Sequence, residues 1–359
     1  MQIGVFLPIG NNGWLISTTS PQYAPSFELN RTVTQAAERY GLDFVLSMIK
    51  LRGFGGASGY WDQNLDSFTL MSALAAVTSR IQLYATVPIL AVPPAIAARQ
   101  AMTIDNISGG RFGLNLITGW QKAEYAQMGL WPGEAHYGQR YDMLTEYVSI
   151  MQALWTTGRC DLKGRFFTME DCRLGPLPSR PIPMIAAGTS DPGMAFAAQC
   201  CTYNFCTGQG AINDPRDSAA NVARLRQATA AAGTQVQALA LTMVIADETD
   251  AAAEAKWQHY VAGTDHEALA WRVAQASGDA NPTANSHSLH LRKATPLPNG
   301  GSKLIGSYAT IARLLDEMAE IEGLAGVMLT FDDFRIGIEQ FGQRIQPLMR
   351  SRQNALQAA

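Results

Sequence analysis

The chain has 359 residues, a formal net charge of −3 and 16% charged residues, against about 25% in ordinary globular proteins. Its hydrophobic content of 47% excludes intrinsic disorder, and a chain this long can bury a sizeable core. The weak negative charge and the lack of a dense Lys/Arg run disfavour a nucleic-acid partner.

The N-terminal segment MQIGVFLPIG has no basic region and no cleavage-site pattern, so we expect no secretory signal. Apolar runs stay shorter than the roughly 18 residues of a membrane span, so we expect no membrane partner. The five cysteines show no C-x-x-C spacing, which favours reduced thiols and a cytoplasmic location. The histidines form no H-E-x-x-H motif, and no metal site is predicted.

Short apolar runs alternate with longer amphipathic segments along the whole chain. The runs typical of strands lie at residues 3–8, 43–48, 81–86, 112–117, 183–187, 202–207, 238–246 and 326–331. Amphipathic helices are predicted at residues 29–40, 67–78, 141–156, 221–232 and 307–320. This repeated alternation predicts an α/β fold, a (β/α)8 TIM barrel, with a doubly wound sheet as the alternative.

A bare barrel needs about 250 residues, so roughly a hundred residues must belong to insertions. One insertion, residues 119–138, follows the fourth predicted strand. The other, residues 277–301, is polar, rich in Pro, Gly and Asn, and without periodicity, so we expect a mobile loop and a candidate lid. Because the barrel pattern continues on both sides, we predict one domain over residues 1–359.

Chemistry in such a barrel takes place at the C-terminal ends of the strands. The second predicted strand ends at Met48, followed by Ile49 and Lys50, and the third ends at Thr86. Asn115 stands inside the apolar fourth strand, where a carboxamide needs a partner and can bind the N–H and C=O groups of a heterocycle. The alternative is that Asn115 holds a neighbouring loop. Threonine is common in strands, so Thr86 is a candidate functional residue only because Asn115 is expected nearby.

The fifth strand runs into AAGTSDPG, a pattern typical of anion sites. Gly188 ends the strand and Ser190 opens a helix, whose free N–H groups and dipole favour phosphate. Arg140 and Tyr141, expected at the start of another helix, offer a guanidinium and a hydroxyl to the same phosphate. The alternative is that Arg140 is a surface residue near its own helix.

Several familiar motifs are absent. The stretch GFGGASG lacks the third glycine of a dinucleotide fingerprint, and no P-loop pattern occurs. The predicted strand ends carry neither a carboxylate pair nor a Ser/His/Asp set, while Trp120 lies in a loop where it can stack on a flat ring or simply pack. These features favour a phosphorylated planar cofactor that carries the chemistry itself.

The stretch ISGGRFGLNLITGWQ resembles the S-x-G-R-x-x-x-G/N signature of bacterial-luciferase-like flavin monooxygenases. Within that family, the chain resembles the pyrimidine monooxygenases of bacterial uracil degradation in MQIGVFLPIGNNGWLIST, LSMIKLRGFGG, TGWQKAEYAQMG, GSYATIARLLDEMA and LTFDDF. The resemblance spans nearly the whole chain and is weakest over residues 208–234 and 277–301.

The resemblance implies a (β/α)8 barrel that binds reduced FMN (FMNH2), supplied by a separate NADH-dependent flavin reductase. It implies that O2 adds to the flavin and that the flavin peroxide opens uracil between N3 and C4. The product would be ureidoacrylate, initially as the peracid, and thymine is a second candidate substrate. A homo-oligomer is also expected from the family.

By motif position, the resemblance carries the FMN contacts over to Ile49, Lys50, Asn115, Glu124, Arg140, Tyr141 and Ser190. Glu124 rests on the resemblance alone, whereas Met48 and Gly188 are added from their places at strand ends. We expect Thr86 and Asn115 to hold dioxygen against the flavin and to orient the substrate carbonyl. Trp120 is expected to wall the pyrimidine.

Three other functions stay open from the sequence. A deazaflavin-dependent reductase on the same barrel would transfer hydride without activating oxygen. A non-catalytic relative would bind flavin and turn nothing over. A metal-dependent hydrolase is disfavoured because no ligand set stands at the strand ends.

Overall fold

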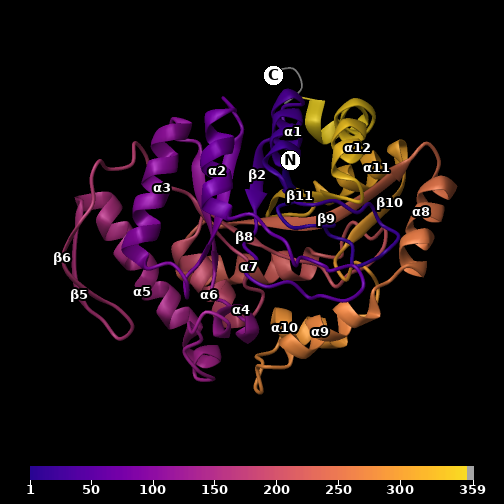
Figure 1. Ribbon diagram of the computed structural model, residues 1–359. Coiled ribbons are helices and arrows are strands. Elements are labelled where there is room, and N and C mark those ends of the chain that lie inside the picture. The colour runs from indigo at the N-terminus through magenta and orange to yellow at the C-terminus, as the bar shows by residue number, and fades with distance from the viewer. Residues whose placement is uncertain (354–359) are drawn as a thin grey trace.

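The computed structural model describes residues 1–353, so the last positions of the predicted domain over 1–359 lie outside the described residues. Its parallel strands close into a barrel through the pairing of β8 with β9 (Figure 1). The barrel strands are β1 (Gln2–Phe6), β2 (Phe44–Ser47), β3 (Gln82–Pro88), β4 (Phe112–Ile117), β7 (Met184–Ala186), β8 (Tyr203–Phe205), β9 (Gln237–Asp247) and β11 (Leu324–Phe331). Each predicted strand overlaps one of these, which confirms the barrel, and the doubly wound alternative is wrong.

Helices surround the barrel: α1 (Phe27–Arg39), α2 (Ser67–Ala76), α3 (Pro94–Ser108), α5 (His136–Thr157), α6 (Asp191–Cys200), α7 (Ala219–Ala232), α11 (Tyr308–Met318) and α12 (Phe334–Gln340). All the predicted helices are present. The start of α5 differs, because it begins at His136 and so places Arg140 and Tyr141 in its second turn rather than at its N-terminus. At these two positions the helix can therefore offer a ligand the side chains, but not the free backbone N–H groups of its first turn.

Side chains fill the barrel interior, so the barrel is not an open channel. Phe44, Leu46, Tyr84, Ile185, Phe205, Leu239 and Met328 form this buried cluster. Alternate residues of each parallel strand point inward, which is why these positions come from strands around the ring. Any ligand must therefore lie at the mouth of the barrel rather than inside it.

Two sheet features were not predicted from the sequence. Strand β10 (Lys303–Ser307) pairs in parallel with the C-terminal end of β9, beyond the residues of β9 that pair with β8. Strands β5 (Arg159–Lys163) and β6 (Thr168–Arg173) form an antiparallel hairpin at the edge of the molecule (Figure 1). Most hairpin side chains are at least partly exposed, so the segment lacks the apolar run that marks a barrel strand.

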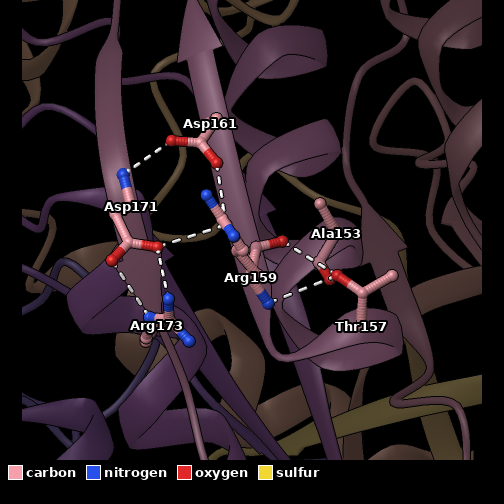
Figure 2. A network of polar contacts seen from close by, with 6 residues as sticks. All are labelled: Ala153, Thr157, Arg159, Asp161, Asp171 and Arg173. Carbon is pink, nitrogen blue, oxygen red and sulfur yellow. Dashed lines mark hydrogen bonds and ion pairs between the residues drawn. The ribbon is translucent and has the colours of Figure 1, made fainter.

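Charged side chains join the two strands of this hairpin, as Figure 2 shows. The Arg159 Nε lies 2.9 Å from Asp161 Oδ2 and 3.2 Å from Asp171 Oδ1. The Arg173 guanidinium lies 2.8 Å from Asp171 Oδ1. These groups are all exposed, so such ion pairs add little stability, and charged side chains are typical of edge strands.

Both predicted insertions contain short helices. Residues 119–138 include α4 (Lys122–Ala126), and residues 277–301 include α10 (His287–Lys293), although no helix was expected there. The Ser286 side chain caps α10 by accepting a hydrogen bond from Leu289 N at 3.3 Å. After α8 (Asp250–Ala262), helix α9 (His266–Ala276) packs on α10, and both lie at the lower edge of Figure 1 beyond the strands.

Two further observations bear on the sequence expectations. In the part of the chain from residue 1 to 353, no helix is both long and apolar enough to span a bilayer. All five cysteines are free thiols.

Candidate functional site

A cavity of about 370 Å³ opens at the C-terminal ends of the barrel strands, within the usual size range of small-molecule sites. Its floor includes Leu46, Phe205 and Met328 of the barrel cluster. On the opposite side, α9 and the insertion at 277–301 contribute Arg272 and His287. The structure brings together Met48, Ile49, Lys50, Asn115, Trp120, Glu124, Arg140, Tyr141, Gly188 and Ser190 as lining residues.

Thr86 and Asn115 are register partners on β3 and β4, and both are buried. The Asn115 Nδ2 donates to Thr86 Oγ1 at 2.9 Å, and the Thr86 hydroxyl donates to the Ser47 carbonyl at 2.6 Å. Because a hydroxyl has one proton, Thr86 can only accept from Asn115, which fixes the direction of the carboxamide. The Asn115 Oδ1 is buried and is left without a hydrogen-bond partner within the described residues.

Of this pair, Asn115 lines the cavity and Thr86 lies behind it. The Ser67 hydroxyl also accepts the Thr86 backbone N–H at 2.9 Å, so both polar groups of Thr86 are engaged by the protein. In this arrangement Thr86 reaches a ligand through Asn115 rather than by direct contact.

A buried ion pair joins the end of β2 to α4. The Lys50 Nζ lies 3.0 Å from Glu124 Oε1 and also donates to the Gln121 side chain. The Leu51 backbone N–H donates to the same Glu124 oxygen at 3.1 Å. Burial lowers the pKa of Lys50 to about 8, although the Glu124 carboxylate opposes this shift. Because the two charges are opposite, the pair is neutral as a unit while Lys50 is protonated.

Arg140 projects from α5 into the cavity, where its guanidinium carbon lies 5.5 Å from the centroid of the Tyr141 ring. Its Nε is buried and unsatisfied, and no hydrogen bond or ion pair joins its guanidinium to any group in residues 1–353. An unpaired buried charge is costly, so such a group is expected where an anionic ligand completes it. This geometry agrees with the functional interpretation of Arg140 rather than with the surface alternative.

Tyr141 lies beside the N-terminus of α6. A Cβ added at Gly188 or at Gly193 would stand 2.6 or 2.5 Å from the Tyr141 hydroxyl, so glycine is needed at both positions for this approach. Ser190 is the N-cap of α6 and accepts from Gly193 N at 3.4 Å. The hydroxyl of Tyr141 and the positive end of α6 thus meet in one cradle suited to an anion.

The tryptophans of the loops above the strand ends differ in whether they line the cavity. Trp14 and Trp61 pack edge to face with ring centroids 5.0 Å apart, and both line the cavity. Trp120 also lines it and meets the His287 ring at 5.7 Å, whereas Trp131 packs on His136 outside it. The ring of Trp120 is thus a wall of the cavity that is held by the insertion at 277–301.

Arg272 and His287 are lining residues that sequence reasoning missed. Neither lies at a strand end, and the helix that carries Arg272 has no motif to single it out. In residues 1–353, no cluster of three or more His, Cys, Asp or Glu side chains is placed to hold a metal ion. The charged lining of the cavity is therefore best described by its arginines and the Lys50–Glu124 pair.

Comparisons with known proteins identify the family of the chain. A family model described as luciferase-like monooxygenase matches residues 1–324. The chain is 58% identical to the pyrimidine monooxygenase RutA of Klebsiella pneumoniae subsp. pneumoniae, over 98% of this chain and 97% of that protein. RutA of Escherichia coli is also 58% identical, with the same coverage.

A solved structure supports the fold. The riboflavin lyase RcaE, determined with modified FMN and the substrate riboflavin, matches with a TM-score of 0.83 and 20% identity. The match covers 98% of this chain and 92% of that one. The resemblance to the pyrimidine monooxygenases is confirmed by the curated relatives, and the family model covers most of the sequence. The chain is therefore an oxidoreductase that belongs to the luciferase-like monooxygenase family.

Proposed function

We propose that the chain is an FMN-dependent pyrimidine monooxygenase that opens uracil between N3 and C4 to give ureidoacrylate, initially as the peracid. Thymine is a second proposed substrate. A separate NADH-dependent flavin reductase is proposed to supply FMNH2. The 58% identity to RutA over 98% of the chain supports this substrate class.

One observation carries the proposal: a single cavity holds two unsatisfied groups of different chemistry. The Arg140 guanidinium lacks an anion, and the Asn115 Oδ1 lacks a donor. A phosphorylated isoalloxazine together with a pyrimidine offers both a phosphate and ring N–H groups. The residues present therefore fit FMN, with Arg140, Tyr141 and Ser190 proposed at the phosphate.

When bound and reduced, FMN supplies the activation of dioxygen. The protein's own groups bind, orient and exclude water. Lys50, Ile49 and Met48 at the end of β2, with Glu124, are proposed to hold the ring system, and Gly188 lets the phosphate approach the backbone. Asn115 is proposed to accept a ring N–H, and Trp120 to wall the pyrimidine. Thr86 is proposed to set the direction of the Asn115 amide.

The insertion at 277–301 is proposed as the cover of this site within one barrel domain. Thr189, beside the α6 cradle, donates through its hydroxyl to the Asn285 carbonyl at 2.7 Å. His287, from the same insertion, lines the cavity. A cover tied to the phosphate cradle would keep water from the reacting groups once the cofactor is bound.

Oxygen uptake tests the proposal directly. Protein mixed with FMN, a flavin reductase and NADH should consume uracil in proportion to the oxygen taken up beyond the uracil-free background. Uracil that persists while oxygen is consumed would contradict the proposed function. Turnover with a reduced deazaflavin and without oxygen would favour the reductase instead.

The role of Thr86 predicts a graded response. We expect Thr86→Val to lower kcat/KM for uracil about tenfold, because a freely rotating Asn115 amide loses a hydrogen bond of roughly 1–2 kcal/mol. Thr86→Ser keeps the hydroxyl and should retain most of the activity. Steady-state kinetics on both variants measure this. Equal kcat/KM for Thr86→Val and wild-type protein would remove Thr86 from the mechanism.

The Lys50–Glu124 pair predicts a pH dependence of FMN binding. Lys50 carries its charge below a pKa of about 8 and loses it above, so FMN affinity should fall as pH rises through this value. Glu124→Gln removes a group that favours the charged form, so the fall should move to lower pH.

Fluorescence titration of FMN across the neutral and alkaline range measures the effect. Lys50→Met should abolish the dependence. Lys303→Met is the matched control, because burial also lowers the pKa of Lys303 to about 8 but this side chain does not line the cavity. An unshifted fall in Glu124→Gln would contradict the assignment to Lys50.

A further inference from the structure

Arg272 is the second unpaired guanidinium of the cavity. It projects from α9 and lines the wall opposite the strand ends, together with Tyr60 and His287. No hydrogen bond or ion pair links it to another group of the described chain, residues 1–353. The Arg272 side chain is partly exposed to the cavity, burial lowers its pKa, and no carboxylate in the described chain is paired with it.

The neighbours of Arg272 do not neutralise it. Glu124 is the carboxylate of the cavity lining, and it is already bound to Lys50 and to the Leu51 N–H. Burial raises the pKa of Tyr60, which keeps the phenol neutral. Burial, and then the charge of Arg272 itself, lower the pKa of His287, and an imidazole offers Arg272 no negative charge. The wall at α9 therefore carries one uncompensated positive charge.

Arg272 and Arg140 lie at different places in the cavity. The charge of Arg140 acts on His136 and Tyr137 of its own helix. The charge of Arg272 acts instead on Lys50, His287 and His290. Arg140 lies beside the Tyr141–α6 cradle, which is suited to the phosphate. Arg272 is therefore available to bind a second negatively charged group in the cavity.

We propose that Arg272 binds the pyrimidine: its guanidinium donates to the substrate carbonyl oxygen and stabilises the negative charge that this oxygen gains during attack. This inference rests on the proposed function. Attack forms a carbon–oxygen bond at the carbonyl carbon and moves the π pair onto the carbonyl oxygen. The pair returns as the C–N bond breaks, and the ring nitrogen leaves with its electrons and takes a proton. A charged donor already in place lowers the energy of that oxyanion.

Two variants and a matched control test the proposal. Arg272→Met removes the charge, and Arg272→Lys keeps it but loses the planar fork. Arg52→Met is the control, because Arg52 is an exposed cation that stacks 5.6 Å from the neighbouring Trp271 ring and does not line the cavity. Each protein is compared for FMN Kd by fluorescence, for uracil Kd by calorimetry on the FMN-loaded form, and for kcat and KM.

For Arg272→Met we expect kcat to fall about 100-fold and uracil Kd to rise about tenfold, while FMN Kd stays within about threefold of wild type. Arg272→Lys should recover part of kcat, and Arg52→Met should behave as wild type. Unchanged kcat and uracil Kd in Arg272→Met would overturn the proposal. So would a weakened FMN Kd with unchanged uracil binding, which would assign the anion to the flavin. Wild-type protein that neither binds nor converts uracil would overturn the proposed function itself.

Discussion

Asn115→Ala is expected to lower kcat/KM for uracil by about two to three orders of magnitude. The Asn115 amide is held by Thr86 at 2.9 Å, and its buried Oδ1 has no partner in the described chain. Oriented polar groups at reacting centres contribute about 3–4 kcal/mol, because they need no reorganisation during the reaction. Steady-state kinetics with saturating FMNH2 measure the loss.

Asn30→Ala is the matched control for that experiment. Asn30 is fully buried in α1, and its Oδ1 also lacks a partner in the described chain, but it does not line the cavity. Both substitutions should therefore lower stability, whereas only the change at Asn115 should abolish turnover. A variant Asn115→Ala that keeps wild-type kcat/KM, or an equal loss in Asn30→Ala, would show that the amide has no direct role.

Arg140→Met is expected to weaken FMN binding about 100-fold while leaving riboflavin binding unchanged. Riboflavin lacks the phosphate, so the difference between the two ligands isolates the contact of the guanidinium with the phosphate. Truncating one partner of a desolvated charge pair costs about 2–5 kcal/mol. Fluorescence quenching of each flavin by wild-type and variant protein measures both affinities.

Although Arg140→Met should weaken FMN binding, it should not lower the stability of the flavin-free protein. Without flavin, the Arg140 charge is buried and unpaired, so Arg140→Met should leave the thermal unfolding temperature of the flavin-free protein unchanged or raised. Arg313→Met, at an exposed residue of α11 paired with Glu317, should change neither affinity. An equal loss of FMN and riboflavin affinity in Arg140→Met would contradict the phosphate assignment.

The barrel could be predicted from the sequence because its strands are buried on both faces. Apolar runs such as residues 326–331 are typical of strands covered on both faces, and β11 follows that run closely. The hairpin β5–β6 was missed for the opposite reason, since its mostly exposed strands show no apolar alternation. Helix α10 was missed because its segment is short and polar, and its stability depends on packing against α9.

Some residues of the candidate site could likewise be predicted from the sequence, and others could not. Asn115 could be singled out because a carboxamide is out of place in a buried strand, and the structure places it on the cavity. The direction of its amide could not be predicted, because it depends on Thr86 donating to Ser47 across the register of three strands. Arg272 could not be predicted from the sequence either, because only the placement of α9 over the strand ends brings it to the cavity.

We propose that this cavity binds reduced FMN and directs oxygen into a pyrimidine ring. The most direct measurement is mass analysis of the product formed from uracil, FMN, NADH and a flavin reductase under isotopically labelled dioxygen. We expect a ring-opened ureidoacrylate product that carries the label and is absent without the protein. Intact uracil with labelled hydrogen peroxide as the sole oxygen product would contradict it.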